Sequence, residues 1–151
     1  MLKPCFATVV VLVSTSTLAR SQTPNYQIVA LPDTQVYTTT PELVEIMLEQ
    51  IDWIRAHAET DEITFVAHVG DVVESGATGP NRNEVGWERA VEALDRLEGG
   101  PPESQRSPMP YSVAIGNRDY DVISDKDQGT SRFEEFFSRD RYVDEPWYLG
   151  S

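Results

Sequence analysis

Residues 63–74 read ITFVAHVGDVVE, and this stretch decides the fold. Its first part, residues 63–69, is a short run of mostly apolar side chains, which predicts a strand buried on both faces of a parallel sheet. Gly70 and Asp71 follow, and residues of these types end strands because they favour turns. The stretch therefore predicts a buried strand with a carboxylate at its carboxyl end.

Two further stretches repeat this arrangement on either side. Residues 26–31 (YQIVAL) predict a first buried strand, which leads into the run Asp33-Thr34-Gln35. Residues 111–115 (YSVAI) predict a third strand, which leads into the run Gly116-Asn117-Arg118-Asp119. Each predicted strand therefore ends in polar residues.

Apolar residues at helical spacing separate the strands. A first helix is expected over residues 41–58, because Thr40 suits the N-cap and Pro41 suits the first helical position. A second helix is expected over residues 83–98, where the run GGP at 99–101 stops it. The side chains expected to face the core are Leu43, Ile46, Met47, Ile51 and Ile54 in the first helix and Trp87, Val91, Leu94 and Leu97 in the second.

The order strand, helix, strand, helix, strand predicts an α/β fold with parallel strands and right-handed crossovers. Ligands of such sheets bind outside the carboxyl ends of the strands. A short aromatic helix containing Phe133, Phe136 and Phe137 is expected after the third strand. The aromatic segment at residues 133–148 is expected to find little to pack against.

The composition is that of a globular domain. The chain has 151 residues, of which 40% are hydrophobic and 25% charged. Its formal net charge of −13 repels a phosphate backbone, so no nucleic-acid partner is expected, and solubility is the simplest role of the charge. A small phosphoester could still reach a local metal site, because a bound dication reverses the local field. Cys5 is the only cysteine, so neither a disulfide framework nor a cysteine-ligated zinc site is expected.

The N-terminal residues 1–21 have the order of a secretory signal peptide. A positive charge precedes an apolar stretch at residues 5–13, and small, mostly polar residues follow. Cleavage after Ala19 or Ser21 is expected, which leaves residues 22–151 as one domain of an exported protein (periplasmic, extracellular or cell-surface). The apolar stretch is far shorter than the ~20 residues of a spanning helix, so no transmembrane span is expected in the mature chain. A buried N-terminal strand is the alternative interpretation.

The strand ends carry residues suited to a hard cation. Parallel neighbours bring Asp33, Gln35, Asp71 and Asn117 to one edge of the sheet. Two carboxylates and two amide oxygens suit Mg, Mn, Fe or Zn in an oxygen-rich site. Taken singly, each of these residues could equally cap or form a turn. Their occurrence at the ends of three successive strands favours a shared site.

Three runs at these strand ends resemble the motifs of the calcineurin-like metallophosphoesterases. The runs are LPDTQ at residues 31–35, HVGDVVE at residues 68–74 and IGNRDY at residues 115–120. In order and spacing they are similar to that family's D-x-H or D-x-Q, G-D-x-x-(D/E) and G-N-H-(D/E) motifs, and the resemblance covers about residues 26–151. It implies the β-α-β-α-β first half of a four-layer α/β/β/α metallophosphoesterase sandwich, with the second half absent.

The resemblance also implies two divalent metal ions (Mn, Fe, Zn or Mg) and a small phosphoester substrate. Asp33 and Gln35 would hold the first metal, Asp71 would bridge both, and Asn117 would hold the second. Such a pair of ions positions a phosphomonoester or phosphodiester and activates water for attack on phosphorus. The implied function is metal-dependent phosphoester hydrolysis.

Two departures from the family pattern concern catalysis. Arg118 stands where the family has a histidine that protonates the leaving group, and Asp119 is the carboxylate that would orient it. Arginine binds phosphate oxygens but keeps its proton at ordinary pH, and general acid catalysis is worth ~10²–10⁴-fold. The family's three later histidines are also missing, since the chain has only His57 and His68. His57 is expected on a helix surface and His68 as a hydrogen-bonded core residue or a support for a metal ligand.

These departures leave half a site and two main hypotheses. The leading one is an exported phosphoesterase represented by its N-terminal half, with little or no turnover in the 151-residue chain. The alternative is a catalytically inactive module that keeps a metal or phosphate pocket, in which Arg118 acts as a fixed cation. A nucleotide-binding α/β protein is a third possibility, which the absence of a G-x-G-x-x-G or G-x-x-x-x-G-K-(S/T) run disfavours.

Overall fold

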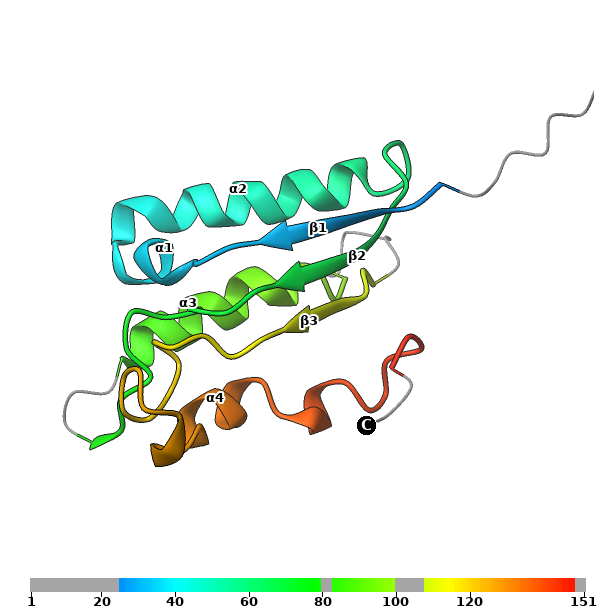
Figure 1. Cartoon of the computed structure of the whole chain (residues 1–151). Coiled ribbons are helices and arrows are strands. Elements are labelled where there is room, and N and C mark those ends of the chain that lie inside the picture. The colour runs from blue at the N-terminus through cyan, green and yellow to red at the C-terminus, as the bar shows by residue number, and fades with distance from the viewer. Residues whose placement is uncertain (1–24, 80–82, 100–107, 149–151) are drawn as a thin grey trace, which may run out of the picture.

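The computed structural model describes residues 25–79, 83–99 and 108–148, so the predicted signal peptide lies outside the described residues. Within them the chain is a mixed α/β structure around a parallel three-stranded sheet of order β1-β2-β3 (Figure 1). The strands are β1 (Gln27–Leu31), β2 (Ile63–His68) and β3 (Tyr111–Val113). Leu31 pairs with His68, which in turn pairs with Val113, so the three strands end in register. The predicted succession of strands and helices along the chain and the parallel direction of the strands are confirmed.

The helices connect the strands as the apolar spacing predicts, with one addition. The longer helices α2 (Pro41–His57) and α3 (Glu84–Asp95) carry the two crossovers, and α4 (Ser131–Phe136) is the short aromatic helix. The helix α1 (Gln35–Thr39) was not predicted, and the 3₁₀ turns are η2 (Lys126–Gln128) and η3 (Arg139–Arg141). None of the helices in the described part of the chain has the length and apolar character needed to cross a membrane.

The helix ends differ slightly from the prediction. Thr40 is the N-cap of α2 but caps through its backbone, whose carbonyl accepts from Leu43 N at 2.9 Å, and not through its hydroxyl. Asn83 is the N-cap of α3, because its side chain accepts from Gly86 N at 3.1 Å. α3 ends at Asp95 and continues as turns, so it is shorter than predicted.

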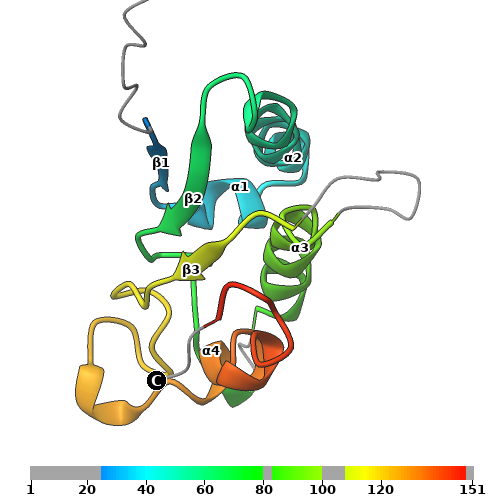
Figure 2. The same ribbon diagram turned by 90° about the vertical axis from the view of Figure 1, so that its right-hand side faces the viewer.

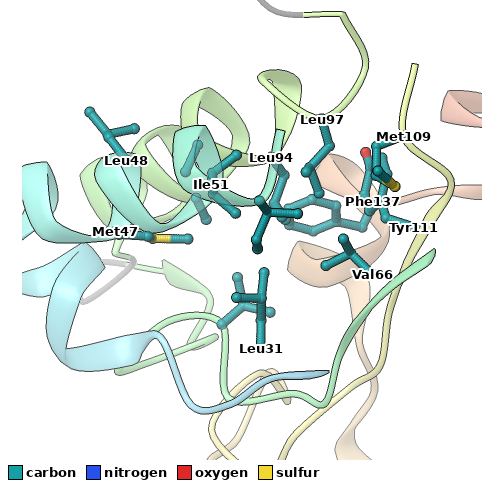
Figure 3. Packing of buried hydrophobic residues seen from close by; sticks show 14 of the residues in the cluster. Leu31, Met47, Leu48, Ile51, Val66, Leu94, Leu97, Met109, Tyr111 and Phe137 are labelled. Carbon is teal, nitrogen blue, oxygen red and sulfur yellow. The ribbon is translucent and has the colours of Figure 1, made fainter. Parts of the chain in front are cut away.

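The core lies between one face of the sheet and the helices α2 and α3, which cover that face together (Figures 2 and 3). Leu31 and Val66 come from the sheet, and the side chains of the two helices close over them. The helix residues buried in this core include Met47, Leu48, Ile51, Ile54, Trp87, Ala90, Ala93 and Leu94, and Leu97 joins them from the turns after α3. Ile46 was predicted to face inward but is 42% exposed, because it lies off this stripe.

The strands are less buried than predicted. β1 lies at the edge of the sheet, and Ile28 within it is 59% exposed. In β2, Val66 and His68 are buried on one face, whereas Phe65 and Ala67 on the opposite face are only half-buried. The reason is that α2 and α3 cover one face of the sheet only, and the opposite face has no comparable cover among the described residues.

The aromatic segment after β3 does find packing partners, so that prediction is wrong. Phe136 stacks on Trp87 of α3 with ring centroids 5.5 Å apart, and Phe133 and Phe137 pack around the same ring. Further along, Tyr142 and Trp147 contact Tyr111 of β3 with centroids 5.5 and 5.8 Å away. This segment therefore extends the core beyond β3 without the help of a second sheet.

Candidate functional site

The loops that follow the three strands meet at one edge of the sheet, toward which all three strand arrows point in Figure 1. Asp71 lies at their centre. Its backbone carbonyl accepts from Gln35 N at 3.0 Å, and its carboxylate Oδ1 accepts from Arg118 N at 2.8 Å. The middle loop is thereby bonded to the loops on both sides. The structure thus brings Gln35, Asp71 and Arg118 together, as expected for loops that follow neighbouring parallel strands.

Two glycines allow this close approach. A Cβ on Gly116 would lie 2.0 Å from Asp71 N and 2.2 Å from Asp71 Oδ1, and one on Gly70 would lie 2.6 Å from Gly116 N. Gly70 also has a φ of +105°, which favours glycine. The two Gly-containing motifs therefore pack backbone against backbone, with no room for a side chain between them.

Asp71 itself has an unusual backbone conformation. Its φ is +52°, in the left-handed region, where Asp is among the better tolerated residues but still costs about 1 kcal/mol or more. This conformation orients the carbonyl toward Gln35 and the carboxylate toward Arg118. Glu62 and Ser124 also have positive φ, so it is the combination of this conformation with the two inter-loop hydrogen bonds that makes Asp71 a candidate functional residue.

Asp119 joins the second and third loops. Its side chain is fully buried, Oδ1 accepts from Val72 N at 2.8 Å and Val73 N at 3.2 Å, and Oδ2 accepts from Gly116 N at 2.8 Å. Burial raises the pKa of Asp119 to about 6, although the three amide hydrogen bonds act in the opposite direction. The carboxylate of Asp119 thus accepts hydrogen bonds from the main chain. The resemblance implies a different role, in which this carboxylate orients the side chain at position 118.

His68 is a hydrogen-bonded core residue, one of the two roles predicted for it. Its Nδ1 accepts from Gly70 N at 3.2 Å, so in the neutral ring Nε2 carries the proton and donates to Thr34 Oγ1 at 2.9 Å. The Thr34 hydroxyl donates in turn to Val72 O at 3.1 Å. Burial lowers the pKa of His68 to about 4, partly offset by the charges of Asp33 and Asp71, so the ring is neutral at physiological pH.

His57 lies in the last turn of α2, away from this edge. Its Nδ1 lies 2.8 Å from the backbone carbonyl of Trp53. The imidazole ring also stacks on the ring of Trp53, with centroids 4.3 Å apart. The predicted position on the helix surface is confirmed.

The remaining candidate ligands differ in how they are held. With its amide oriented to satisfy its hydrogen bonds, Gln35 Nε2 donates to the carbonyls of Asp33 at 3.2 Å and Asp71 at 2.9 Å. Asn117 is exposed, and its Nδ2 donates to Ser124 Oγ at 3.2 Å. The backbone N–H of Ser124 donates in turn to the backbone carbonyl of Asn117 at 2.7 Å. Asp33 is exposed beside the start of α1.

Arg118 forms an ion pair across the second and third loops. Its Nη1 donates to Glu74 Oε1, and Nη1 also lies 3.4 Å from the backbone carbonyl of Glu74. The two side chains are 37% and 42% exposed, so the pair lies at the surface of the site and is open to solvent. Among the described residues, the Nε and Nη2 atoms of Arg118 donate no hydrogen bond to protein.

The donor atoms at this edge are oxygens of the type that a hard dication prefers. In the described part of the chain, the carboxylate of Asp33, Oδ2 of Asp71 and Oδ1 of Asn117 accept no protein hydrogen bond, and Gln35 adds an amide oxygen. Such donors suit Mg²⁺ or Mn²⁺ better than a thiolate- or imidazole-preferring metal. Residues 25–79, 83–99 and 108–148 contain no group of three or more His, Cys, Asp or Glu side chains arranged to hold a metal ion, so the candidate set depends on its two amides.

Comparisons with known proteins do not assign the chain to a family. No protein-family model matches it, and no solved structure matches it. Over 127 residues, 83% of the chain, it is 29% identical to "Uncharacterized protein YvnB" of Bacillus subtilis (strain 168). The aligned region covers 8% of that protein, so the chain is similar to a small part of a much longer relative.

Sequence reasoning missed two contributors to this edge of the sheet. Thr34 was treated only as part of the first polar run, yet it is 2% exposed and links His68 to Val72. Glu74 was recognised only as part of its motif, and its ion pair with Arg118 was not foreseen. Neither contact has a local sequence signal, because the partners are far apart in the chain.

Proposed function

We propose that this chain carries the N-terminal metal-binding part of a calcineurin-like phosphoesterase, which hydrolyses phosphomonoesters or phosphodiesters. The observation that carries the proposal is the position of Asp71, bonded to Gln35 on one side and to Arg118 on the other. The three sequence motifs of the resemblance thus meet at a single residue with a strained backbone. Adjacent loops are expected in any parallel sheet, so the support for the proposal lies in the direct hydrogen bonds that join Asp71 to both neighbouring motifs.

The proposed roles follow from the donor atoms that each residue presents. Asp33, Gln35, Asp71 and Asn117 would hold two divalent ions, which supply positive charge at the phosphoryl group and activate water when bound. Arg118 would bind a phosphoryl oxygen, because its guanidinium is a permanent multiple donor. Asp119 would act indirectly, by keeping the loops of Asp71 and Asn117 at a fixed separation.

We also propose that these elements form the β-α-β-α-β half of a four-layer sandwich. The sheet face opposite α2 and α3 carries Ile28, Ala30 and Ser112, which are exposed, and the half-buried Phe65. A largely apolar face of this kind supports a second layer packed against it in a longer protein. We also propose that this protein is exported, because residues 1–21 have the pattern of a signal peptide.

A catalytically inactive binding module is the second candidate function. The observation that favours it is Arg118, which occupies the position of the proton donor and is held by Glu74. An arginine at this point can retain a phosphate but cannot protonate a leaving group. The two functions share a metal site and differ in turnover.

Equilibrium binding of Mn²⁺ tests what the two functions share. We expect saturable binding by the parent chain at low ionic strength and at least ~10-fold weaker binding by Asp71→Asn, because a central anionic ligand is lost. Asp52→Asn is the matched control, since Asp52 pairs with Arg96 on the helix layer and its replacement removes the same charge. Equal weakening by the two substitutions would mean that Mn²⁺ is attracted only by the acidic surface.

A further inference from the structure

We propose that Glu74 is an internal competitor for the anion-binding position of Arg118, so that a phosphoryl group binds at the strand ends by displacing this carboxylate. The inference rests on the proposed function only in taking the strand ends as the place where a phosphoryl group lies. It assigns to Glu74 a regulatory role that neither the motif resemblance nor the comparisons supply.

The guanidinium of Arg118 uses only part of its hydrogen-bonding capacity in the described part of the chain. Its backbone N–H is bound by Asp71, which fixes the position of the residue, whereas the side chain reaches Glu74 through Nη1. The guanidinium has five N–H donors in a fork that matches carboxylate and phosphate oxygens alike. Because Nε and Nη2 have no protein acceptor in the described residues, an incoming oxyanion can engage them before Glu74 leaves.

The exchange is feasible because the ion pair is accessible. The side chains of Glu74 and Arg118 are 42% and 37% exposed, and exposed ion pairs are typically worth only ~0.2–1 kcal/mol. Arg132, by contrast, has a side chain only 10% exposed and is held by two carboxylates, Glu84 and Glu135. Arg118 is therefore poised to change partner, whereas Arg132 is fixed.

The chemistry of the neighbourhood restricts the ligand. Asp33, Asp71 and Glu74 give this edge a negative field that opposes every anion, so a ligand binds only if its hydrogen bonds to the guanidinium outweigh this repulsion. A phosphate dianion offers three strong acceptor oxygens to the guanidinium fork and replaces the charge of Glu74 more than fully. The ligand class is accordingly a phosphate or phosphomonoester.

Titration with inorganic phosphate in chelator-containing buffer, followed by NMR of the ¹⁵N-labelled chain, tests this role without any metal. We expect Glu74→Gln to bind phosphate about 2- to 5-fold more tightly than the parent, the factor expected for release of an exposed ion pair. The shifts should centre on Arg118, and the double substitution Glu74→Gln with Arg118→Gln should lose the gain. Asp52→Asn is the control, because it frees Arg96 from a similar carboxylate pair far from the strand ends and should leave phosphate binding unchanged.

Three results would overturn the inference: no phosphate binding by either protein, equal affinity of parent and Glu74→Gln, or a gain that persists without Arg118. A purely structural ion pair would change the urea midpoint of Glu74→Gln but not its phosphate affinity, so both are measured. Mn²⁺ binding is recorded on the same proteins. Loss of the phosphate effect with Mn²⁺ binding intact refutes only the role of Glu74, whereas absent Mn²⁺ binding refutes the proposed function.

Discussion

The carboxylate of Asp71 accepts a 2.8 Å hydrogen bond from the backbone N–H of Arg118, so the residue at the centre of the three loops is oriented by main chain. A backbone donor is present whatever side chain occupies position 118. Substitutions of Arg118 should therefore leave Asp71 in place and change only what the side chain itself does. This separation makes the role of Arg118 testable.

Arg118→His should supply a proton donor at an undisturbed site. Under the phosphoesterase proposal, we expect Mn²⁺-dependent hydrolysis of a chromogenic phosphodiester to rise by up to ~10²-fold, the lower end of general acid catalysis. Arg118→Gln removes the same charge without supplying a titratable proton, so it should show no gain. A rate for Arg118→His equal to that of Arg118→Gln would favour the binding module.

Gly116→Ala should disrupt the contact between the second and third loops. The added Cβ would lie 2.0 Å from Asp71 N, a distance that forces backbone to move, so we expect a loss of about 3 kcal/mol or more in unfolding free energy. Gly79→Ala is the control, because its Cβ meets nothing within 4 Å and only the positive φ of +79° is unfavourable, at about 1 kcal/mol. Urea unfolding compares the two, and similar losses would show that the close approach is dispensable.

Thr34→Val should cost more stability than Thr38→Val, although both hydroxyls are buried and donate to Val72 O at 3.1 Å. Only Thr34 also accepts from His68, whose Nε2–H would be left buried without a partner, at ~1–3 kcal/mol. Loss of the Thr38 hydroxyl should cost about 1 kcal/mol, because Thr34 still satisfies Val72 O. Thermal or urea unfolding measures the difference, and equal losses would contradict the assigned direction of the His68 hydrogen bond.

Asp119 and His68 should oppose each other in the pH dependence of stability. Burial raises the pKa of Asp119 from 3.8 to about 6, so its stabilising contribution is complete below 3.8 and is lost as the pH rises through 6. Burial lowers the pKa of His68 from 6.5 to about 4, so its contribution is present above 6.5 and is lost as the pH falls toward 4. Between pH 4 and 6 the two effects largely cancel.

Asp119→Asn should expose the effect of His68 alone. In this variant we expect unfolding free energy to rise with pH more steeply than in the parent, by about 1.4 kcal/mol per pH unit between pH 4 and 6. The variant should also be less stable at pH 7, since an amide cannot accept from Val72 and Gly116 through both of its heavy atoms. Urea titrations at several pH values give both quantities, and parallel pH profiles would refute the raised pKa of Asp119.

The sequence predicted the secondary structure where apolar periodicity is strong. The ranges expected for α2 and the three strands agree with the structure to within a few residues. The helix α1 was missed because its sequence, QVYTT, is rich in β-branched residues of low helix propensity. Thr38 shows what tertiary structure adds, since its hydroxyl bonds to Gln35 O within α1 and to Val72 O outside it.

Burial and long-range pairing were the parts that the sequence could not give. An apolar strand such as β1 reads as buried, but its position at the edge of the sheet leaves Ile28 exposed. The contacts of Asp119 with Val72 and of Arg118 with Glu74 join residues more than 40 positions apart, where no periodicity operates. The motifs predicted which loops lie together, and the hydrogen bonds of Asp119 show that its carboxylate supports main chain.

Diffraction from crystals of the chain soaked in Mn²⁺ tests the central claim most directly. The anomalous difference map locates manganese independently of any assumption about ligands. We predict a peak at the carboxyl edge of the sheet, coordinated by Asp71 together with Asp33, Gln35 or Asn117. Peaks confined to the acidic helix surface, with none beside Asp71, would contradict the claim that the strand ends form a metal centre.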